Sequence, residues 1–576
     1  MDRLPDELVL HVFSCLSDHE LAISQFTCRR FRRLTKDFDV WKGRLFDRTP
    51  RQVQYRAAKQ VLDGYPKMLA FVRENCKSLD PKSVIPDLST LPAFAPPKYP
   101  KAVSQANWDP TYPGEQLDLY QEYLHRYAAI APIKWLSSSD GSHRNDPKRR
   151  HPACNVAGMG ALRDANGEST RIVSPLHDGS ICIWTLEDNG STVSFRQNAR
   201  SNLKLLIGDY DSQRSTAMGD VGGTECVAID SQNQRGFFAS NQTVIEVDLR
   251  TLQEISEQVF PAAVTALSSS TALPLTVATS STVHIYDARA RRKKKSSYAA
   301  LAESGCNSIL HDPMDGSIWV GGGFTNILNY DRRFFPRLRG TIHSGGRISS
   351  LSSIPHPFIP HKSDPPYPLA ELQAAKSAPG TTLIAAGVYN GKGSLELYGL
   401  SPGSPAAQTK YQNRQTAARS KLLSVTPHNA ALVISDSDGN IKWFERSGTE
   451  MIRTFNINTT CSTAYPSLCT EFHRPMSGGA DDSNGDMVRK IMPLHEGPNS
   501  DRQNPLLLWT ADGKLGCLSF GRKAHGAENG DGDEDKEEEE GGDETSVAQR
   551  RYEGEMRATL QSQANEARFM RGLGRG

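Results

Sequence analysis

The stretch HDGSICIWTL, residues 177–186, joins an Asp-Gly pair to a strand of alternating apolar residues. Asp-Gly is the favoured two-residue turn of a β-hairpin because it tolerates positive φ angles. The same arrangement returns in SDGNIKWFER (437–446) and ADGKLGCLSF (511–520). Related strands, three of which end in Asp-x-Arg, are TVIEVDLR (243–250), TVHIYDAR (282–289), NILNYDRR (326–333) and GSLELYGL (393–400). Seven similar strands therefore occur between residues 177 and 520.

Where their spacing is regular, these strands recur about every 40 residues, which is typical of a β-propeller of four-stranded blades. The pattern resembles degenerate WD repeats, because an aromatic residue closes most of the strands and TIHSGGRISSL (341–351) is similar to that family's Gly-His segment. Seven strands predict seven blades, with six or eight as alternatives. No strand pattern follows Phe520, so we expect APIKWLSSS (131–139) to supply the outer strand of the last blade and leave no open edge.

The N-terminal segment LPDELVLHVFSCL, residues 4–16, has the spacing of an amphipathic helix with a broad apolar stripe. Ser17 and Glu20 then form the pattern of a capping box, which predicts the start of a second helix. A helical unit of about 45 residues cannot hide this much apolar surface by itself. Either a partner protein or the rest of the chain must cover the stripe.

Residues 4–46 resemble an F-box over their whole length and without a gap, in the initial Leu-Pro, in TCRRFRRL (27–34) and in the closing Trp41. F-boxes of that family bind the Skp adaptor of cullin-based ubiquitin ligases. The resemblance implies that Cys28 and Trp41 hold the helices together. It also implies an adaptor contact formed by Leu4, Pro5, Leu8, Val12, Phe13 and Leu16.

The sequence predicts a multidomain chain that combines α and all-β parts: a three-helix F-box, a helical and Pro-rich linker, a seven-bladed WD-repeat-like β-propeller, and a disordered acidic tail. The linker ends in GEQLDLYQEYLHRYAAI (114–130), an amphipathic helix that presents Leu117, Tyr120, Leu124 and Tyr127. The tail has eleven acidic residues between Glu528 and Glu544, which disfavour a packed core, before a basic C-terminal segment. The expected domain boundaries are 1–48, 49–130, 131–522 and 523–576.

The sequence contains no catalytic motif that we would assign, so we expect a non-catalytic protein without cofactor or metal. The net charge is +2, which gives no general attraction to nucleic acid or membranes, and the ten cysteines include no C-x-x-C pair. GVYNGKGS (387–394) is only superficially similar to a phosphate-binding loop and is better explained as a hairpin turn. Reduced thiols are expected in the cytoplasm or the nucleus.

The function predicted from these features is substrate recognition in a Skp–cullin–F-box ubiquitin ligase, with the F-box on the adaptor and the propeller on a protein substrate. Basic residues near the starts of inner strands are candidates for binding that substrate, including a phosphorylated one: Arg347, Arg419, Lys421, Arg489 and Lys490. One alternative is a scaffold that promotes no degradation. Another is a receptor for a cullin ligase with a propeller adaptor, since its receptors have similar Asp-x-Arg endings. The basic run 289–295 is either a solvated loop, a nuclear import signal or a site for an acidic partner.

Overall fold

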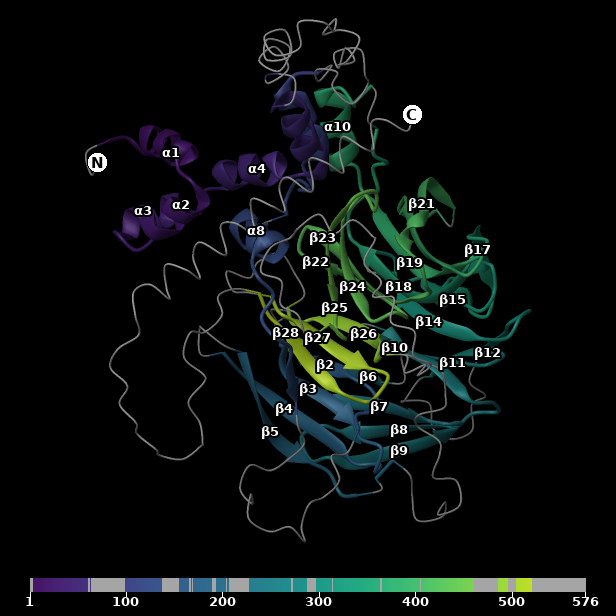
Figure 1. The fold of residues 1–576 in the computed structure, drawn as a ribbon. Coiled ribbons are helices and arrows are strands. Elements are labelled where there is room, and N and C mark those ends of the chain that lie inside the picture. The colour runs from purple at the N-terminus through teal and green to yellow at the C-terminus, as the bar shows by residue number, and fades with distance from the viewer. Residues whose placement is uncertain are drawn as a thin grey trace, which may run out of the picture. The chain divides into compact units, whose positions relative to one another are not determined.

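A computed structural model shows a helical N-terminal region followed by seven small β-sheets (Figure 1). Residues 1–523 form one unit. The structure describes residues 4–60, 63, 99–115, 117–136, 155–164, 167, 169–188, 193–203, 205–206, 227–270, 273–286, 297–312, 314–362, 365–404, 406–459, 485–495 and 504–520. The basic run 289–295, most of the Pro-rich linker and the acidic tail lie outside these residues.

Each of the seven sheets has four antiparallel strands in a meander, so the predicted seven-bladed propeller is confirmed. Sheets 1 to 6 follow chain order. Sheets 1 and 2 contain β2 (Gly160–Arg163), β3 (Ser169–Pro175), β4 (Ile181–Asp188) and β5 (Val193–Arg200), then β6 (Val227–Asp230), β7 (Arg235–Ser240), β8 (Thr243–Asp248) and β9 (Gln253–Val259). Sheets 3 and 4 contain β10 (Val264–Ser270), β11 (Leu273–Thr279), β12 (Thr282–Tyr286) and β13 (Tyr298–Ala300), then β14 (Cys306–His311), β15 (Ile318–Gly322), β16 (Asn326–Tyr330) and β17 (Leu338–His343). Sheets 5 and 6 contain β18 (Arg347–Ile354), β19 (Thr381–Tyr389), β20 (Lys392–Leu400) and β21 (Ala407–Ala418), then β22 (Leu422–His428), β23 (Ala431–Asp436), β24 (Asn440–Glu445) and β25 (Met451–Asn456).

Sheet 7 closes the ring with strands from both ends of the propeller sequence. It contains β26 (Val488–Pro493), β27 (Leu506–Thr510), β28 (Leu515–Leu518) and, as its outer strand, β1 (Lys134–Leu136). Trp135 pairs with Gly516, as expected from the lack of a strand after Phe520. The Trp509 indole donates to the Val156 carbonyl at 2.9 Å, which joins sheet 7 to sheet 1. Both ends of the propeller are thus held in the ring.

Serines on inner strands connect successive sheets. The Ser308 Oγ accepts from the Leu351 N–H at 3.0 Å, the Ser350 Oγ from the Val425 N–H at 3.3 Å, and the Ser424 Oγ from the Ile491 N–H at 3.1 Å. Each serine follows a register shift in its own strand, where the bulge redirects the side chain. These bonds satisfy buried backbone donors that no ladder partner reaches.

We expect Ser350→Ala to destabilise the propeller by about 1–2 kcal/mol, because the buried Val425 N–H loses its acceptor. Urea unfolding of the full chain measures the difference. Ser352→Ala, on the same strand, is the control because the Ser352 side chain is half-buried and outside this sheet-to-sheet bond. Equal stabilities of the two variants would contradict the role of Ser350.

The N-terminal unit contains four short helices, α1 (Asp6–Cys15), α2 (Asp18–Ser24), α3 (Arg29–Leu34) and α4 (Phe38–Asp47). Ser17 and Glu20 form the predicted capping box at the start of α2. The expected second helix divides into α2 and α3, because Cys28 adopts an extended backbone and its Sγ accepts from the Phe31 N–H. Cys28 is exposed, so it caps a helix and does not fill the core.

Candidate functional site

An apolar surface remains exposed on the N-terminal helices. Leu8 on α1 is 53% exposed, and Leu4 and Pro5 just before it are also exposed. Val12 and Leu16 are half-buried. Soluble proteins seldom leave clustered large apolar side chains in water unless they bind something there. Five of the six residues predicted to contact an adaptor therefore have at least part of their side chain available.

Phe13 is the exception and requires a correction. Its side chain is 2% exposed and packs edge-on against Phe31, with ring centroids 5.2 Å apart. It belongs to the core cluster with Val9 and Leu21 and cannot contact a partner directly. The family resemblance placed Phe13 in the adaptor contact with Leu8, but α3 covers the side of α1 on which Phe13 lies.

Two exposed residues were missed by sequence reasoning. Ile23 on α2 is 54% exposed, and Phe26, directly after that helix, is 87% exposed. The capping box predicted a second helix but not where it ends, and the break between α2 and α3 leaves both side chains outside the core. Arg29, Arg32 and Arg33 on α3 are also exposed and follow this apolar pair in the chain.

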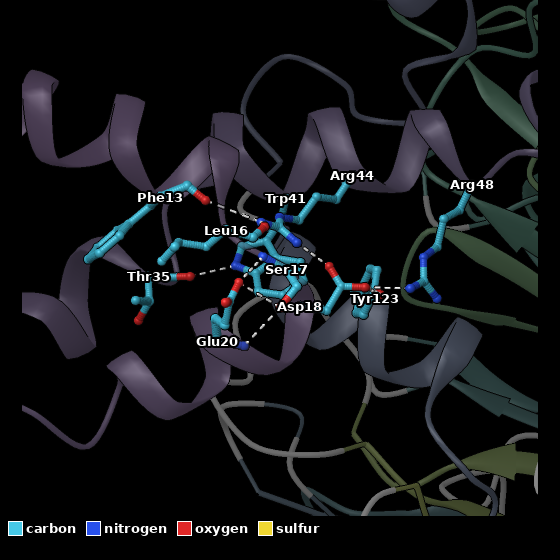
Figure 2. Close-up of polar contacts among 10 residues, drawn as sticks. All are labelled: Phe13, Leu16, Ser17, Asp18, Glu20, Thr35, Trp41, Arg44, Arg48 and Tyr123. Atoms are coloured by element: carbon cyan, nitrogen blue, oxygen red, sulfur yellow. Dashed lines mark hydrogen bonds and ion pairs between the residues drawn. The ribbon is translucent and has the colours of Figure 1, made fainter. Parts of the chain in front are cut away.

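Asp18 connects three helices of this region (Figure 2). Its carboxylate accepts hydrogen bonds from Arg44 and Arg48 of the α4 region and from the Tyr123 hydroxyl. Arg44 also donates to the Phe13 and Leu16 carbonyls at the end of α1. These carbonyl groups belong to the last turn of the helix, where no N–H of the helix is available to them. Burial by itself raises the pKa of Asp18, but the Tyr123 hydroxyl and the two guanidinium groups more than offset it and lower the pKa overall.

The pKa of Asp18 predicts a loss of stability in acid. A carboxylate whose pKa is lowered by folding stabilises the native state above its ordinary pKa of 3.8, and this contribution disappears as the pH falls through the lower folded value. We expect α4 amides to lose protection from hydrogen exchange in this range more steeply in the wild type than in Asp18→Asn. Asp39→Asn changes an exposed carboxylate of the same unit and should keep the wild-type slope. Identical slopes in all three proteins would contradict the assignment.

Helix α8 (Leu119–Tyr127) lies between the N-terminal helices and the propeller. On one side, Trp41 packs against Tyr120 and Tyr123, with ring centroids 4.9 and 4.7 Å away. Trp41 is 2% exposed and its Nε1–H donates to the Thr35 carbonyl at 2.6 Å. The N-terminal core therefore continues into α8.

The other side of α8 is polar and fully buried against the propeller. The Arg126 guanidinium pairs with Glu122 of the same helix at 2.5 Å and, through both terminal nitrogens, with Glu445 at 2.5 and 3.0 Å. The second Glu122 oxygen accepts from the Ala430 N–H at 3.1 Å. Burial lowers the pKa of Arg126, but the two carboxylates outweigh it, so the pKa is raised overall and the residue stays charged.

The segment before α8 adds further contacts with the propeller. The Asn107 side chain exchanges two hydrogen bonds with the Tyr367 backbone, at 3.1 and 2.9 Å, in the insertion between β18 and β19. Arg446 forms a bidentate pair with Glu115 at 2.5 and 2.8 Å. Tyr112 stacks on His356 with ring centroids 4.6 Å apart. A small cavity of about 90 Å³ remains between this segment, the insertion and sheet 6.

These contacts identify the end of the propeller that carries the helices. Ala430 lies between β22 and β23 and Glu445 ends β24. Asn504 and Phe520, which both contact His125 of α8, flank β27 and β28. Because the strands alternate in direction, all these positions lie at one end of sheets 6 and 7. The helical unit therefore docks on the end where inner strands finish.

The predicted substrate-binding residues lie at the opposite end. Arg347 begins β18, Arg419 and Lys421 directly precede β22, and Arg489 and Lys490 lie in the first half of β26. The first three are exposed, and the Arg489 guanidinium lies 5.8 Å from the centre of the Trp509 ring. The fold thus brings these five residues to the starts of three neighbouring inner strands, while their role in substrate binding stays a prediction.

The described residues contain no group of His, Cys, Asp and Glu arranged to hold a metal. GVYNGKGS forms the hairpin between β19 and β20, where Tyr389 pairs with Lys392, so it is a turn as predicted. None of the helices that the structure describes combines the length and apolar character needed to cross a membrane.

The comparison with protein families matches residues 1–47 to the family described as F-box-like. No curated protein matches the chain. F-box domains generally bind Skp-type adaptors. Together with the seven sheets of the C-terminal region, this match shows that the chain combines an F-box-like domain at residues 1–47 with a seven-bladed β-propeller.

Proposed function

We propose that this chain is the substrate receptor of a Skp–cullin–F-box ubiquitin ligase. One observation carries the proposal: the exposed apolar F-box surface is joined, through a buried helix, to one end of a propeller whose opposite end has basic side chains at the starts of three inner strands. A receptor needs these two separate surfaces. It needs no catalytic residue, because holding a substrate near a bound conjugating enzyme raises the effective concentration of the reacting lysine.

The adaptor surface is proposed to consist of Leu4, Pro5, Leu8, Val12 and Leu16, extended by Ile23 and Phe26. Removing apolar side chains of this kind from water is the dominant favourable term in most protein–protein association. Exposed Arg29, Arg32 and Arg33 beside them favour an adaptor with acidic side chains at the edge of its apolar groove. The cytoplasm or the nucleus is the proposed location of this assembly.

The substrate surface is proposed to be the end with Arg347, Arg419, Lys421, Arg489 and Lys490. Guanidinium groups pair well with phosphate, so a phosphorylated protein segment is the favoured substrate. The alternative receptor role, for a ligase with a propeller adaptor, is less favoured. The Asp248 and Asp331 carboxylates each accept from a backbone N–H two residues later, at 2.8 and 2.9 Å, which explains two Asp-x-Arg endings as turns.

Co-purification tests the proposal with variants that each remove one partner. Leu8→Glu with Phe26→Glu should abolish adaptor capture, because charges cannot enter an apolar interface without a large penalty. Arg347→Ala with Arg419→Ala should keep the adaptor and lose substrates captured from phosphatase-inhibited lysate. Val259→Glu, at an exposed apolar position on β9, is the control that should keep both.

Two outcomes would contradict the proposal. Adaptor binding by the Leu8/Phe26 double variant would show that the F-box surface is wrongly assigned. Captured substrates whose half-lives are unchanged when the chain is deleted would favour a scaffold that promotes no degradation.

A further inference from the structure

A second group of exposed apolar side chains belongs to sheet 4 and its turns. Its members are Phe334, which is 67% exposed, Met314 and Leu338. Met314 lies in the turn between β14 and β15, and Phe334 lies in the turn between β16 and β17. Both turns are at the end of the propeller that carries the helices, because they follow the finishing ends of the first and third strands.

The β16–β17 turn holds Phe334 outward on a fixed backbone. The Asp331 carboxylate accepts from the Arg333 N–H at 2.9 Å and caps the short 3₁₀ helix η3 (Arg332–Phe334). The Arg337 N–H donates to the Phe334 carbonyl at 2.9 Å. Phe335 packs against Tyr330, with ring centroids 5.6 Å apart, and so anchors the turn. Because the turn is already ordered, binding a partner there would cost little conformational entropy of this chain.

An ion pair joins the two turns. The Arg339 guanidinium pairs with Asp315 at 2.6 Å and donates to the Gly403 carbonyl of sheet 5 at 2.7 Å. Met314 directly precedes Asp315 and Leu338 directly precedes Arg339, so the ion pair holds the backbone at both exposed apolar residues close together. Burial raises the pKa of Asp315, but the bond to Arg339 outweighs it and lowers the pKa, which keeps the carboxylate charged.

The surface has an excess of positive charge. Arg333 and Arg337, on either side of Phe334, are both exposed. The three acidic residues of these turns are already engaged: Asp312 with the Met314 N–H and the Trp319 indole, Asp315 with Arg339, and Asp331 with a backbone donor. Aromatic, Met and Arg side chains are the types most enriched in protein interfaces, and a buried aromatic ring commonly dominates the binding energy.

We infer that this surface binds an acidic protein segment that carries a large apolar side chain. The apolar side chain would contact Phe334, Met314 and Leu338, and the carboxylates would pair with Arg333 and Arg337. A membrane is the less favoured occupant, because two arginines and one protruding ring give only weak attraction to anionic lipid. The site is separate from the F-box surface and from the basic end with Arg347, and is therefore a third interaction surface.

Fluorescence anisotropy of the full chain tests this inference with a labelled peptide of glutamates and glycines around one central Phe. We expect saturable binding at low salt that weakens strongly in about 0.5 M NaCl, because exposed charge pairs are then screened. Phe334→Ala should weaken binding about tenfold, as expected for the central side chain of an interface. Arg333→Glu with Arg337→Glu should weaken binding at least as much. Arg333→Lys with Arg337→Lys keeps both positive charges and should retain most of the affinity.

Arg250→Glu is the matched control. Arg250 is an exposed arginine in the equivalent Asp-capped turn of sheet 2, and no exposed aromatic residue follows it there. This variant should bind the peptide as the wild type does. Three results would overturn the inference: no binding of the peptide, equal loss in the Arg250 variant, or Phe334-dependent binding to phosphatidylserine vesicles without binding to the peptide.

Discussion

Arg126→Ala should weaken the docking of α8 on the propeller by about 3–5 kcal/mol. The substitution leaves the carboxylates of Glu122 and Glu445 buried without their cation, and removing one partner of a buried ion pair has a cost of this size. The helical unit should then detach from sheet 6 more often, while the propeller core remains intact. We expect α8 amides to exchange their hydrogens at least about 100-fold faster than in the wild type.

Two further variants separate the charge effect from a general loss of packing. Lys101→Ala removes an exposed pair with Asp47, and should change exchange rates little because surface pairs contribute about 0–1 kcal/mol. The triple variant Glu122→Gln, Arg126→Met, Glu445→Gln has no buried charge to leave unpaired and should regain most of the lost protection. A triple variant as weak as Arg126→Ala would contradict this explanation.

Trp41→Ala should destabilise the F-box by about 3–5 kcal/mol, the usual cost of truncating a buried aromatic side chain. The variant loses the contacts with Tyr120 and Tyr123 and also the hydrogen bond to the Thr35 carbonyl. Hydrogen exchange of α1 and α4 amides measures the effect. Adaptor capture should fall with it, because the adaptor surface depends on a folded unit.

Phe26→Ala should show the opposite combination. Its ring is 87% exposed, so its removal should change stability by no more than about 0.5 kcal/mol. Adaptor affinity should nevertheless fall about tenfold or more if this ring enters the interface. Normal adaptor affinity of Phe26→Ala would show that Phe26 does not belong to the adaptor surface. Normal hydrogen exchange in Trp41→Ala would show that Trp41 does not stabilise the F-box core.

Local sequence patterns predicted the repeating parts of the fold. The three Asp-Gly pairs are hairpin turns, with φ angles of +78°, +78° and +75° at Gly179, Gly439 and Gly513. The strand at 134–136 lies in the segment expected to pair with the last blade, because no strand pattern follows Phe520. The capping box predicted the start of α2. Each of these signals lies within a few residues of sequence or repeats at a regular interval.

The functional surfaces depended more on tertiary structure. Helical spacing grouped Phe13 with Leu8, but α3 covers one and leaves the other in water. Spacing also could not show that the chain breaks before α3 and leaves Phe26 outside the core. Which side of an apolar stripe is covered depends on how the next helices cross it, and helical period does not encode that angle.

The sequence by itself determined that α8 is an amphipathic helix with an apolar side for packing, and that the C-terminal region is a closed ring of blades. Only the tertiary structure decided that the polar side of α8 is buried too. Glu122 and Arg126 have the pattern of a solvated helix face, yet their partners Ala430 and Glu445 are more than 300 residues away in the chain. A charged side chain has the same local pattern in water and in a buried network, because its environment is set by distant residues that the fold brings beside it.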